Sequence, residues 1–354
     1  MTEIVLDGLA AGENRPPYVI AEIGNNHMGD MEEAKRLIAM ARDSGANAVK
    51  TQKRDNATLF TKAFYNSPYH SEAAYANTYG AHREHFEFSL AQFLELQEYA
   101  NFMGISFIAT PFDLPSVDFL EGVEIPFYKV ASGSITNPLL LRKIAATGKP
   151  IVASFGGIDY ETMEKAVEAL TARGSELVML HCTASYPAKP EHLGLERIAI
   201  MKYDYPDHVI GFSDHQDGID QAVAAYTLGA RVFEKHITMS HSNRGTDHAF
   251  SLEYMGFRAY VTNLHKTYMA IRALDHPLEV EEKPLYKMGY AVYPAKDLEA
   301  GTTLMPEDLV IKSPMEGLVG WEYDKIVGME LTKDVEKEQP LDWDDFNGEE
   351  TIDE

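Results

Sequence analysis

The chain of 354 residues is long enough for one large domain and a smaller one, and 45% of it is hydrophobic, so a sizeable core is expected. The net charge of −24, from 55 acidic and 31 basic residues, argues against nucleic acid and anionic membranes as partners. The single cysteine, Cys182, rules out an internal disulfide and suits the cytoplasm, and we expect neither a signal peptide nor a membrane-spanning segment.

A repeated strand–helix rhythm fills the first three quarters of the chain. Runs rich in apolar and β-branched residues predict eight strands, at 18–24, 47–52, 105–112, 127–132, 150–155, 176–183, 208–215 and 231–238. Helices are predicted after them, at 30–45, 90–104 and near 115–121, 137–147, 160–173, 192–202, 218–228 and 251–274. Nearly continuous apolar strands are typical of parallel sheets covered on both faces. We therefore predict an α/β fold of the (β/α)8 TIM-barrel type.

An open, doubly wound sheet is the alternative fold. It usually has fewer strands and a glycine-rich first turn, and the chain has no GxGxxG motif. The barrel is predicted over 1–275, followed by a proline-rich, charged linker over 276–292. Short β-type runs predict a small domain over 293–348, and 349–354 forms an acidic tail. The aromatic loop 59–86 is either a lid over the pocket or a decorated connection.

Polar side chains stand at the C-terminal ends of most predicted strands, where TIM barrels carry their chemistry. Residues two apart share a strand face, so Lys50 pairs with Gln52, Ser213 with His215, and Glu234 with His236. If these faces point inward, the two histidines meet at one mouth and could hold a divalent metal. The plainer alternative is that each histidine is an ordinary core or loop residue.

Two lysines, Lys50 and Lys129, would stand among hydroxyl groups in the same ring. Four hydroxyl side chains end the neighbouring strands: Thr110, Ser132, Ser154 and Ser213. Buried lysines need partners, and an anion carrying carboxylate and phosphate would supply them. A salt bridge from Lys129 to an acid at the barrel mouth, such as Glu22, is the competing explanation.

Eight stretches together resemble the sialic acid synthases and the related pseudaminic, legionaminic and spore-coat polysaccharide synthases. They occur in the family's order across about residues 15–275: AEIGNNHMGD, AVKTQ, FIATPFD, YKVASG, LHCTASYP, GFSDH, FEKHIT and GTDHAFSLE. The segment AKDLEAGTTLMPEDLVIKSP resembles the family's C-terminal antifreeze-like (SAF) domain. The resemblance implies a barrel followed by this domain, and a homodimer in which the small domain of one subunit covers the barrel of the other.

The resemblance also implies a reaction. Phosphoenolpyruvate would condense with the open-chain aldehyde of an amino sugar, with a divalent metal as Lewis acid, to give a 2-keto-3-deoxy sugar acid and phosphate. By position, His215 and His236 would hold Mn2+, or alternatively Mg2+ or Co2+. Phosphoenolpyruvate would be surrounded by Lys50, Thr110, Lys129, Ser132, Ser154 and Ser213. The acceptor sugar would meet Glu22, Tyr186 and Asp247, with Gln52 near the metal. Glu22, Lys50, Lys129 and Glu234 are the expected catalytic residues.

Three positions depart from the family pattern. Ser134 stands where the family usually has a carboxylate, Ala184 where asparagine is frequent, and Ser313 where an arginine reaches the N-acetyl group of the acceptor. We therefore expect an acceptor other than plain N-acetylmannosamine. Three alternatives stay open: an octulosonate-like acceptor, a non-catalytic sugar-binding relative, and an unrelated metal-dependent aldolase or isomerase barrel.

Overall fold

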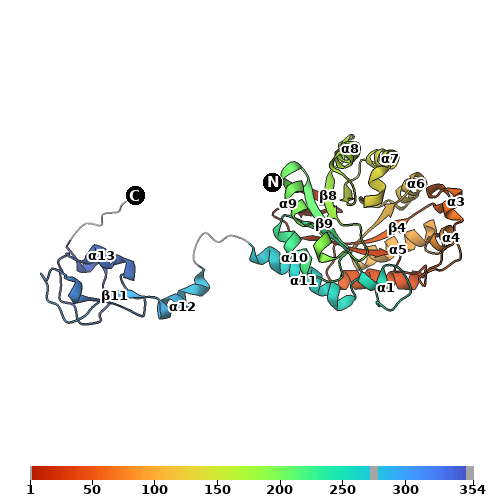
Figure 1. The fold of residues 1–354 in the computed structure, drawn as a ribbon. Coiled ribbons are helices and arrows are strands. Elements are labelled where there is room, and N and C mark those ends of the chain that lie inside the picture. Colours follow the sequence, from red (N-terminus) through yellow and green to blue (C-terminus); the bar gives the residue numbers. More distant parts are fainter. Residues whose placement is uncertain (1, 272–277, 348–354) are drawn as a thin grey trace. The chain divides into compact units, whose positions relative to one another are not determined.

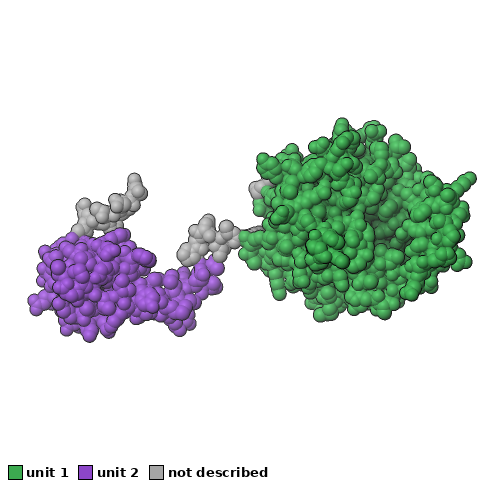
Figure 2. Space-filling model, in the orientation of Figure 1, with its two compact units in different colours: residues 1–272 green, residues 273–354 purple. Residues whose placement is uncertain are grey.

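The computed structural model describes residues 2–271 and 278–347. It divides into two compact units, residues 1–272 and 273–354 (Figure 2). The predicted tail 349–354 and the first residues of the predicted linker lie outside the described residues. None of the helices in the described ranges combines the length and apolar character that crossing a membrane requires.

The first unit is the predicted barrel of eight parallel strands (Figure 1). They run in the order β5-β4-β3-β10-β9-β8-β7-β6, and β5 lies against β6 to close the ring. The strands are β3 (Tyr18–Gly24), β4 (Ala48–Lys53), β5 (Ser106–Pro111), β6 (Tyr128–Val130), β7 (Ile151–Phe155), β8 (Leu177–Cys182), β9 (Val209–Asp214) and β10 (Val232–His236). All eight predicted strands are confirmed.

One main helix follows each strand and covers the outside of the barrel (Figure 1). These helices are α1 (Met31–Asp43), α5 (Leu90–Met103), α6 (Leu114–Val123), α7 (Pro138–Ala145), α8 (Tyr160–Thr171), α9 (Glu196–Asp204), α10 (Asp220–Thr227) and α11 (Tyr254–Ala270). Asp30 caps α1 by accepting hydrogen bonds from the amides of Glu32 and Glu33. The long β4–α5 connection adds the short helices α2 (Asn56–Leu59), α3 (Lys62–Tyr65) and α4 (Tyr79–Glu84).

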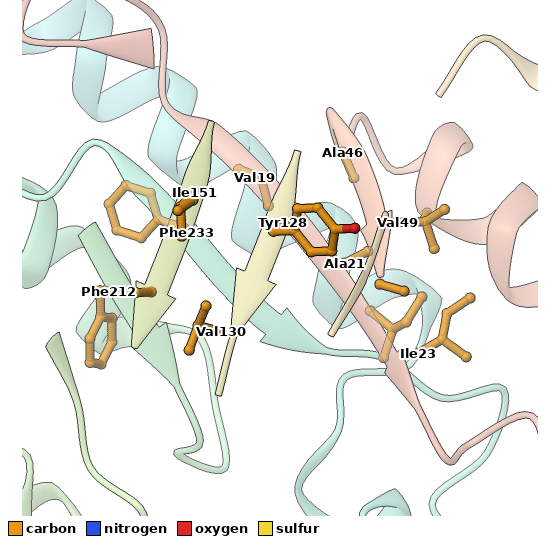
Figure 3. Packing of buried hydrophobic residues seen from close by; sticks show 14 of the residues in the cluster. Val19, Ala21, Ile23, Ala46, Val49, Tyr128, Val130, Ile151, Phe212 and Phe233 are labelled. Atoms are coloured by element: carbon orange, nitrogen blue, oxygen red, sulfur yellow. The ribbon is translucent and has the colours of Figure 1, made fainter. Parts of the chain in front are cut away.

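Two apolar layers follow from the alternation of side chains along the strands. Outward residues such as Val19, Ala21 and Phe233 pack beneath the helices (Figure 3). Inward residues fill the lower half of the barrel: Tyr18, Ile20, Ala48, Ile108, Phe127, Val152, Val178, Leu180, Val209 and Val232. The other half, at the C-terminal ends of the strands, contains the polar residues. The order of apolar and then polar inward residues along each strand therefore separates the apolar core from the candidate site.

An N-terminal hairpin, which the sequence reading missed, joins the inner core. Strands β1 (Glu3–Leu6) and β2 (Leu9–Gly12) pair antiparallel around Asp7 and Gly8, both at positive φ as this tight turn requires. Ile4, Leu6 and Ala11 belong to the same apolar cluster as the inward residues of the strands. The hairpin therefore supplies apolar side chains to the lower half of the barrel.

The second unit has its own small core. Strands β11 (Ala291–Pro294) and β12 (Leu309–Lys312) pair antiparallel, and α13 (Tyr323–Ile326) follows. The core consists of Val292, Leu298, Leu304, Leu309, Leu318, Ile326, Leu331, Val335, Leu341 and Phe346. The stretch predicted as linker contains a helix, α12 (Glu279–Met288), despite Pro284 inside it. The prolines and charges of this segment predicted an irregular linker, but the chain is helical on both sides of Pro284.

Candidate active site

The strand ends bring their polar residues to one side of the barrel. On β4, Lys50 and Gln52 follow the inward Ala48, and on β10, Glu234 and His236 follow the inward Val232. These residues line a cavity of about 1070 Å3. That volume is at the upper end of pockets that hold small molecules, so two substrates fit together.

Most of the predicted site residues meet in this cavity. Twelve of them line it: Glu22, Lys50, Gln52, Lys129, Ser132, Ser154, Tyr186, Ser213, His215, Glu234, His236 and Asp247. Thr110 is not on the wall; it is fully buried and accepts a hydrogen bond from Nζ of Lys50 at 3.0 Å. Thr110 therefore orients a lysine of the wall rather than facing the cavity.

The two lysines form a buried charge network with two glutamates. Nζ of Lys50 lies 2.9 Å from Oε2 of Glu22 and 3.6 Å from Oε2 of Glu234. Nζ of Lys129 lies 3.5 Å from Oε1 of Glu234 and donates to Oγ of Ser154 at 2.7 Å. The salt bridge weighed for Lys129 exists, but with Glu234. Glu22 instead pairs with Lys50.

Burial and pairing shift these groups in different directions. Burial raises the pKa of Glu22 against the pull of Lys50. Burial acts the same way on Glu234, but Lys129 and Lys50 outweigh it and lower the pKa of Glu234. Burial also lowers the pKa of Lys129. The pKa of Lys50 is raised because its two carboxylate neighbours outweigh burial. Glu234 is thus the firmly ionised acid and Glu22 the one able to hold a proton near neutral pH.

The two predicted histidine ligands are neighbours. The ring centroids of His215 and His236 lie 5.4 Å apart. Nδ1 of His215 is 3.2 Å from the carbonyl oxygen of Thr183, which leaves Nε2 for a ligand. Nδ1 of His236 is buried without a hydrogen-bond partner and lies 4.0 Å from Oδ2 of Asp247. Burial lowers the pKa of each imidazole to about 3, so both are neutral at physiological pH.

A divalent metal fits this pair as an open site. Neutral imidazoles are good ligands for transition-metal ions, and the orphaned Nδ1 of His236 is a polar atom in need of a partner. Within residues 2–271 and 278–347, no group of three or more His, Cys, Asp or Glu could enclose a metal ion. The two histidines would therefore leave coordination positions for water and substrate, as a Lewis-acid site requires.

Three further side chains near the strand ends differ in how they meet the cavity. His181 faces outward, where Nε2 lies 2.6 Å from the carbonyl oxygen of Leu193 and the ring stacks on Phe212. Cys182 is buried and lines the cavity, and burial raises the pKa of its thiol to about 11. His27 packs against Phe88 and is not on the wall.

The three departures from the family pattern occupy different places. Ala184 lines the cavity, so a small apolar side chain stands on the wall there. Ser134 is buried in the turn after β6 and is not on the wall. Ser313 belongs to the second unit, where its hydroxyl donates to the carbonyl of Lys287 at 2.7 Å.

Three arginines on the wall were missed: Arg54, Arg83 and Arg244. Arg54 had a signal, because it continues the every-second-residue spacing of Lys50 and Gln52 beyond the predicted end of the strand. Arg83 and Arg244 lie on α4 and on the long β10–α11 connection. Such connections have no periodic pattern, so spacing could not have placed these two side chains.

Comparison with known proteins now decides the family. The NeuB family model matches residues 37–275 and the SAF domain model matches 291–347. The chain belongs to the NeuB family. It is 36% identical to the N-acetylneuraminate-9-phosphate synthase of Homo sapiens over 94% of each chain. It is 32% identical to the N,N'-diacetyllegionaminic acid synthase of Campylobacter jejuni, over 91% of this chain and 97% of the relative.

Solved structures agree with this NeuB assignment. The N-acetylneuraminic acid synthetase of Leptospira borgpetersenii, solved with citrate, superimposes with a TM-score of 0.71 at 31% identity, over 80% of this chain and 95% of its own. The barrel and the SAF domain predicted from the sequence are thereby both confirmed.

Proposed function

We propose that this NeuB-family chain condenses phosphoenolpyruvate with the open-chain aldehyde of an amino sugar to give a sialic-acid-like, nonulosonic sugar acid and phosphate. One observation carries the proposal. Two buried lysines and three serine hydroxyls share a single cavity with a pair of neutral histidines. Cations with hydroxyl donors suit a carboxylate and a phosphate, and imidazoles suit a metal that polarises an aldehyde. The similarity to nonulosonic acid synthases supports the same reaction.

The reaction balances without an oxidant or reductant. A carbon–carbon bond forms between C3 of phosphoenolpyruvate and the aldehyde carbon, and the aldehyde oxygen takes up a proton. Water adds to C2, and the bond from C2 to the phosphate oxygen breaks to release phosphate and leave a keto group.

Each charged residue has a role in this scheme. Lys50 and Lys129, with Ser132, Ser154 and Ser213, hold the anionic ends of phosphoenolpyruvate. Glu22, whose pKa is raised by burial, supplies the proton to the aldehyde oxygen.

The remaining residues position the reactants. Glu234 stays ionised between the two lysines and fixes their ammonium groups. His215 and His236 would hold the metal, which we propose to be Mn2+, with Mg2+ or Co2+ as alternatives. That metal, when bound, acts as a Lewis acid on the aldehyde. Tyr186 and Asp247, which also line the cavity, would contact the acceptor sugar.

We also propose that the protein works in the cytoplasm as a homodimer in which each SAF domain covers the barrel of the partner. The family resemblance supports this arrangement, and the reducing compartment agrees with the single Cys182. A partner made of nucleic acid is disfavoured by the net charge of −24.

The test is an acceptor panel. Purified protein with Mn2+ and phosphoenolpyruvate is offered neutral and phosphorylated amino sugars, and loss of phosphoenolpyruvate is measured against phosphate release. We expect one-to-one stoichiometry with an acceptor other than plain N-acetylmannosamine. Lys129→Met should raise KM for phosphoenolpyruvate about 10- to 100-fold, since a charge-assisted hydrogen bond is lost. Lys165→Met, at an exposed ion pair, is the matched control.

Three results would contradict the proposal. Turnover of a sugar without phosphoenolpyruvate would indicate an aldolase or isomerase. Binding of a sugar with no consumption of phosphoenolpyruvate for any acceptor would indicate a non-catalytic relative. N-acetylmannosamine as the best acceptor would contradict the expectation of an altered acceptor side.

A further inference from the structure

The cavity carries more positive charge than the lysine pair accounts for. Five cationic side chains and four carboxylates line it, although acidic residues outnumber basic ones by 55 to 31 in the whole chain. Lys50 and Lys129 are already matched by Glu22 and Glu234. The surplus therefore lies with the three arginines, because Glu72 and Asp247 are the two acids of the wall that remain.

These arginines come from three separate segments and gather at one part of the wall. Arg54 follows β4, Arg83 is on α4 and Arg244 is on the β10–α11 connection. After burial, the charge of Arg83 is the largest cause that lowers the pKa of Arg54. Besides burial, Arg83 and Arg244 both help to lower the pKa of His82, to about 4. Like charges thus act on the same neighbours, and an anion bound between the arginines would offset that repulsion.

Arg54 is the anchor of this group. Its side chain is 8% exposed and lies over the ring of Phe112, with the guanidinium carbon 3.9 Å from the ring centroid. Nη2 donates to Oε1 of Gln52 at 2.5 Å, and Nη1 is 4.0 Å from Oε1 of Glu87, too far for a hydrogen bond. The buried guanidinium thus keeps donors available, at a position fixed by packing.

Arg83 and Arg244 form no ion pair within the described part of the chain. Arg83 donates through Nε and Nη2 to the hydroxyl of Tyr79, at 3.2 and 3.0 Å. Arg244 bonds the carbonyl oxygens of Glu72 and Ala74 and so ties the β10–α11 connection to the loop after α3. Neutral partners hold both guanidinium groups in place and leave their charge unmatched.

The geometry points to a second anion subsite, and we propose that Arg54, Arg83 and Arg244 bind a phosphate ester on the acceptor sugar. This inference rests on the proposed function and names its substrate class: a phosphorylated amino sugar, not a neutral one. Planar guanidinium groups from several directions suit a phosphate dianion better than a sugar hydroxyl.

A hydrogen-bond chain connects the two anion subsites. Lys50 pairs with Glu22, Glu22 accepts from Nε2 of Gln52 at 2.7 Å, and Gln52 accepts from Arg54. The arginines are thus separated from the lysines by a carboxylate and an amide, which suit the hydroxyl groups of a sugar. A phosphate at the arginines would leave the sugar chain over Glu22 and Gln52 and its aldehyde near the histidines.

The experiment compares N-acetylmannosamine 6-phosphate with N-acetylmannosamine in the full-length enzyme with Mn2+ and phosphoenolpyruvate. We expect a higher kcat/KM for the phosphorylated sugar. Arg83→Gln should lower that value about 10- to 100-fold, since it removes a charge-assisted contact. It should leave KM for phosphoenolpyruvate and kcat/KM for the neutral sugar within about threefold. Arg54→Lys keeps the positive charge but loses the planar guanidinium with its several N–H donors, so it should lower kcat/KM for the phosphorylated sugar by a smaller factor than Arg83→Gln. Arg173→Gln, exposed just before β8 and so at the opposite end of the barrel, is the control.

Each outcome bears on the inference. A preference of the wild type for the neutral sugar, an equal loss for both sugars in Arg83→Gln, or a raised KM for phosphoenolpyruvate would overturn it. Calorimetric titration with N-acetylmannosamine 6-phosphate tests the phosphate subsite separately from the proposed reaction. Binding that Arg83→Gln weakens, without turnover, would refute the condensation but support the subsite. Absence of both binding and turnover would refute both.

Discussion

Glu234→Gln is the sharpest test of the buried charge network. The side chain keeps its shape but loses the charge that faces Lys129 at 3.5 Å and Lys50 at 3.6 Å. At an effective dielectric constant of about 20, each attraction is worth about 5 kcal/mol before desolvation is subtracted. Removing one partner of a buried pair typically costs about 3–5 kcal/mol. We expect the free energy of unfolding to fall by about that amount, because Lys129 loses its only carboxylate partner among the described residues.

Chemical denaturation without ligands measures this loss, with Glu161→Gln as the matched control. Glu161 forms an exposed pair with Lys165 one helical turn away, and its loss should cost less than about 0.5 kcal/mol. Phosphoenolpyruvate should then raise the melting temperature of Glu234→Gln more than that of the wild type, because an anion replaces the missing charge. A loss below about 1 kcal/mol, or an equal effect of phosphoenolpyruvate on both proteins, would refute this account of the lysines.

Two further predictions concern the metal and the barrel wall. His236→Ala should weaken Mn2+ binding, which calorimetry measures. The loss should exceed the roughly 10- to 100-fold that follows removal of a residue hydrogen-bonded to a metal ligand, because here a ligand itself is removed. His70→Ala, on an exposed loop, should leave Mn2+ affinity unchanged, and equal affinities of the two variants would contradict the proposed ligand pair. Gly211→Ala should destabilise the fold by about 1–3 kcal/mol or more, because a Cβ there would lie 2.2 Å from the carbonyl oxygen of Val232. Gly133→Ala is the control, because a Cβ at that position would have no atom within 4 Å, and its free energy of unfolding should stay within about 0.5 kcal/mol of the wild-type value. Similar free energies of unfolding for the two variants would refute the close packing at Gly211.

The sequence predicted the barrel and most of the side chains that line its cavity, because both depend on strand periodicity. Buried parallel strands give continuous apolar runs, and the last inward positions stand out as polar, as at Lys50 and His236. The charge pairing could not be predicted, since it depends on distances across the barrel. Lys129 faces Glu234 from a strand that is not its neighbour in the sheet.

The N-terminal hairpin and the arginines of the cavity wall were not predicted, for two different physical reasons. The hairpin had a local signal, because an Asp-Gly pair such as Asp7–Gly8 between alternating apolar residues is a strong hairpin pattern. Arg83 and Arg244 had no such signal. Their positions depend on how two long connections meet, through Arg244 and the carbonyl oxygens near Glu72.

The distribution of charge gives a physical reason for placing arginines at the cavity. A protein of net charge −24 repels anionic substrates at a distance. At physiological ionic strength that repulsion is screened beyond about 8 Å, so an approaching anion responds mainly to the charges close to its path. Inside the cavity the balance is reversed, with five cations against four acids, and one of those acids, Glu22, has a raised pKa. In the proposed reaction, phosphoenolpyruvate would bind at the lysines, which leaves the guanidinium charge of Arg54, Arg83 and Arg244 available for a second anionic substrate.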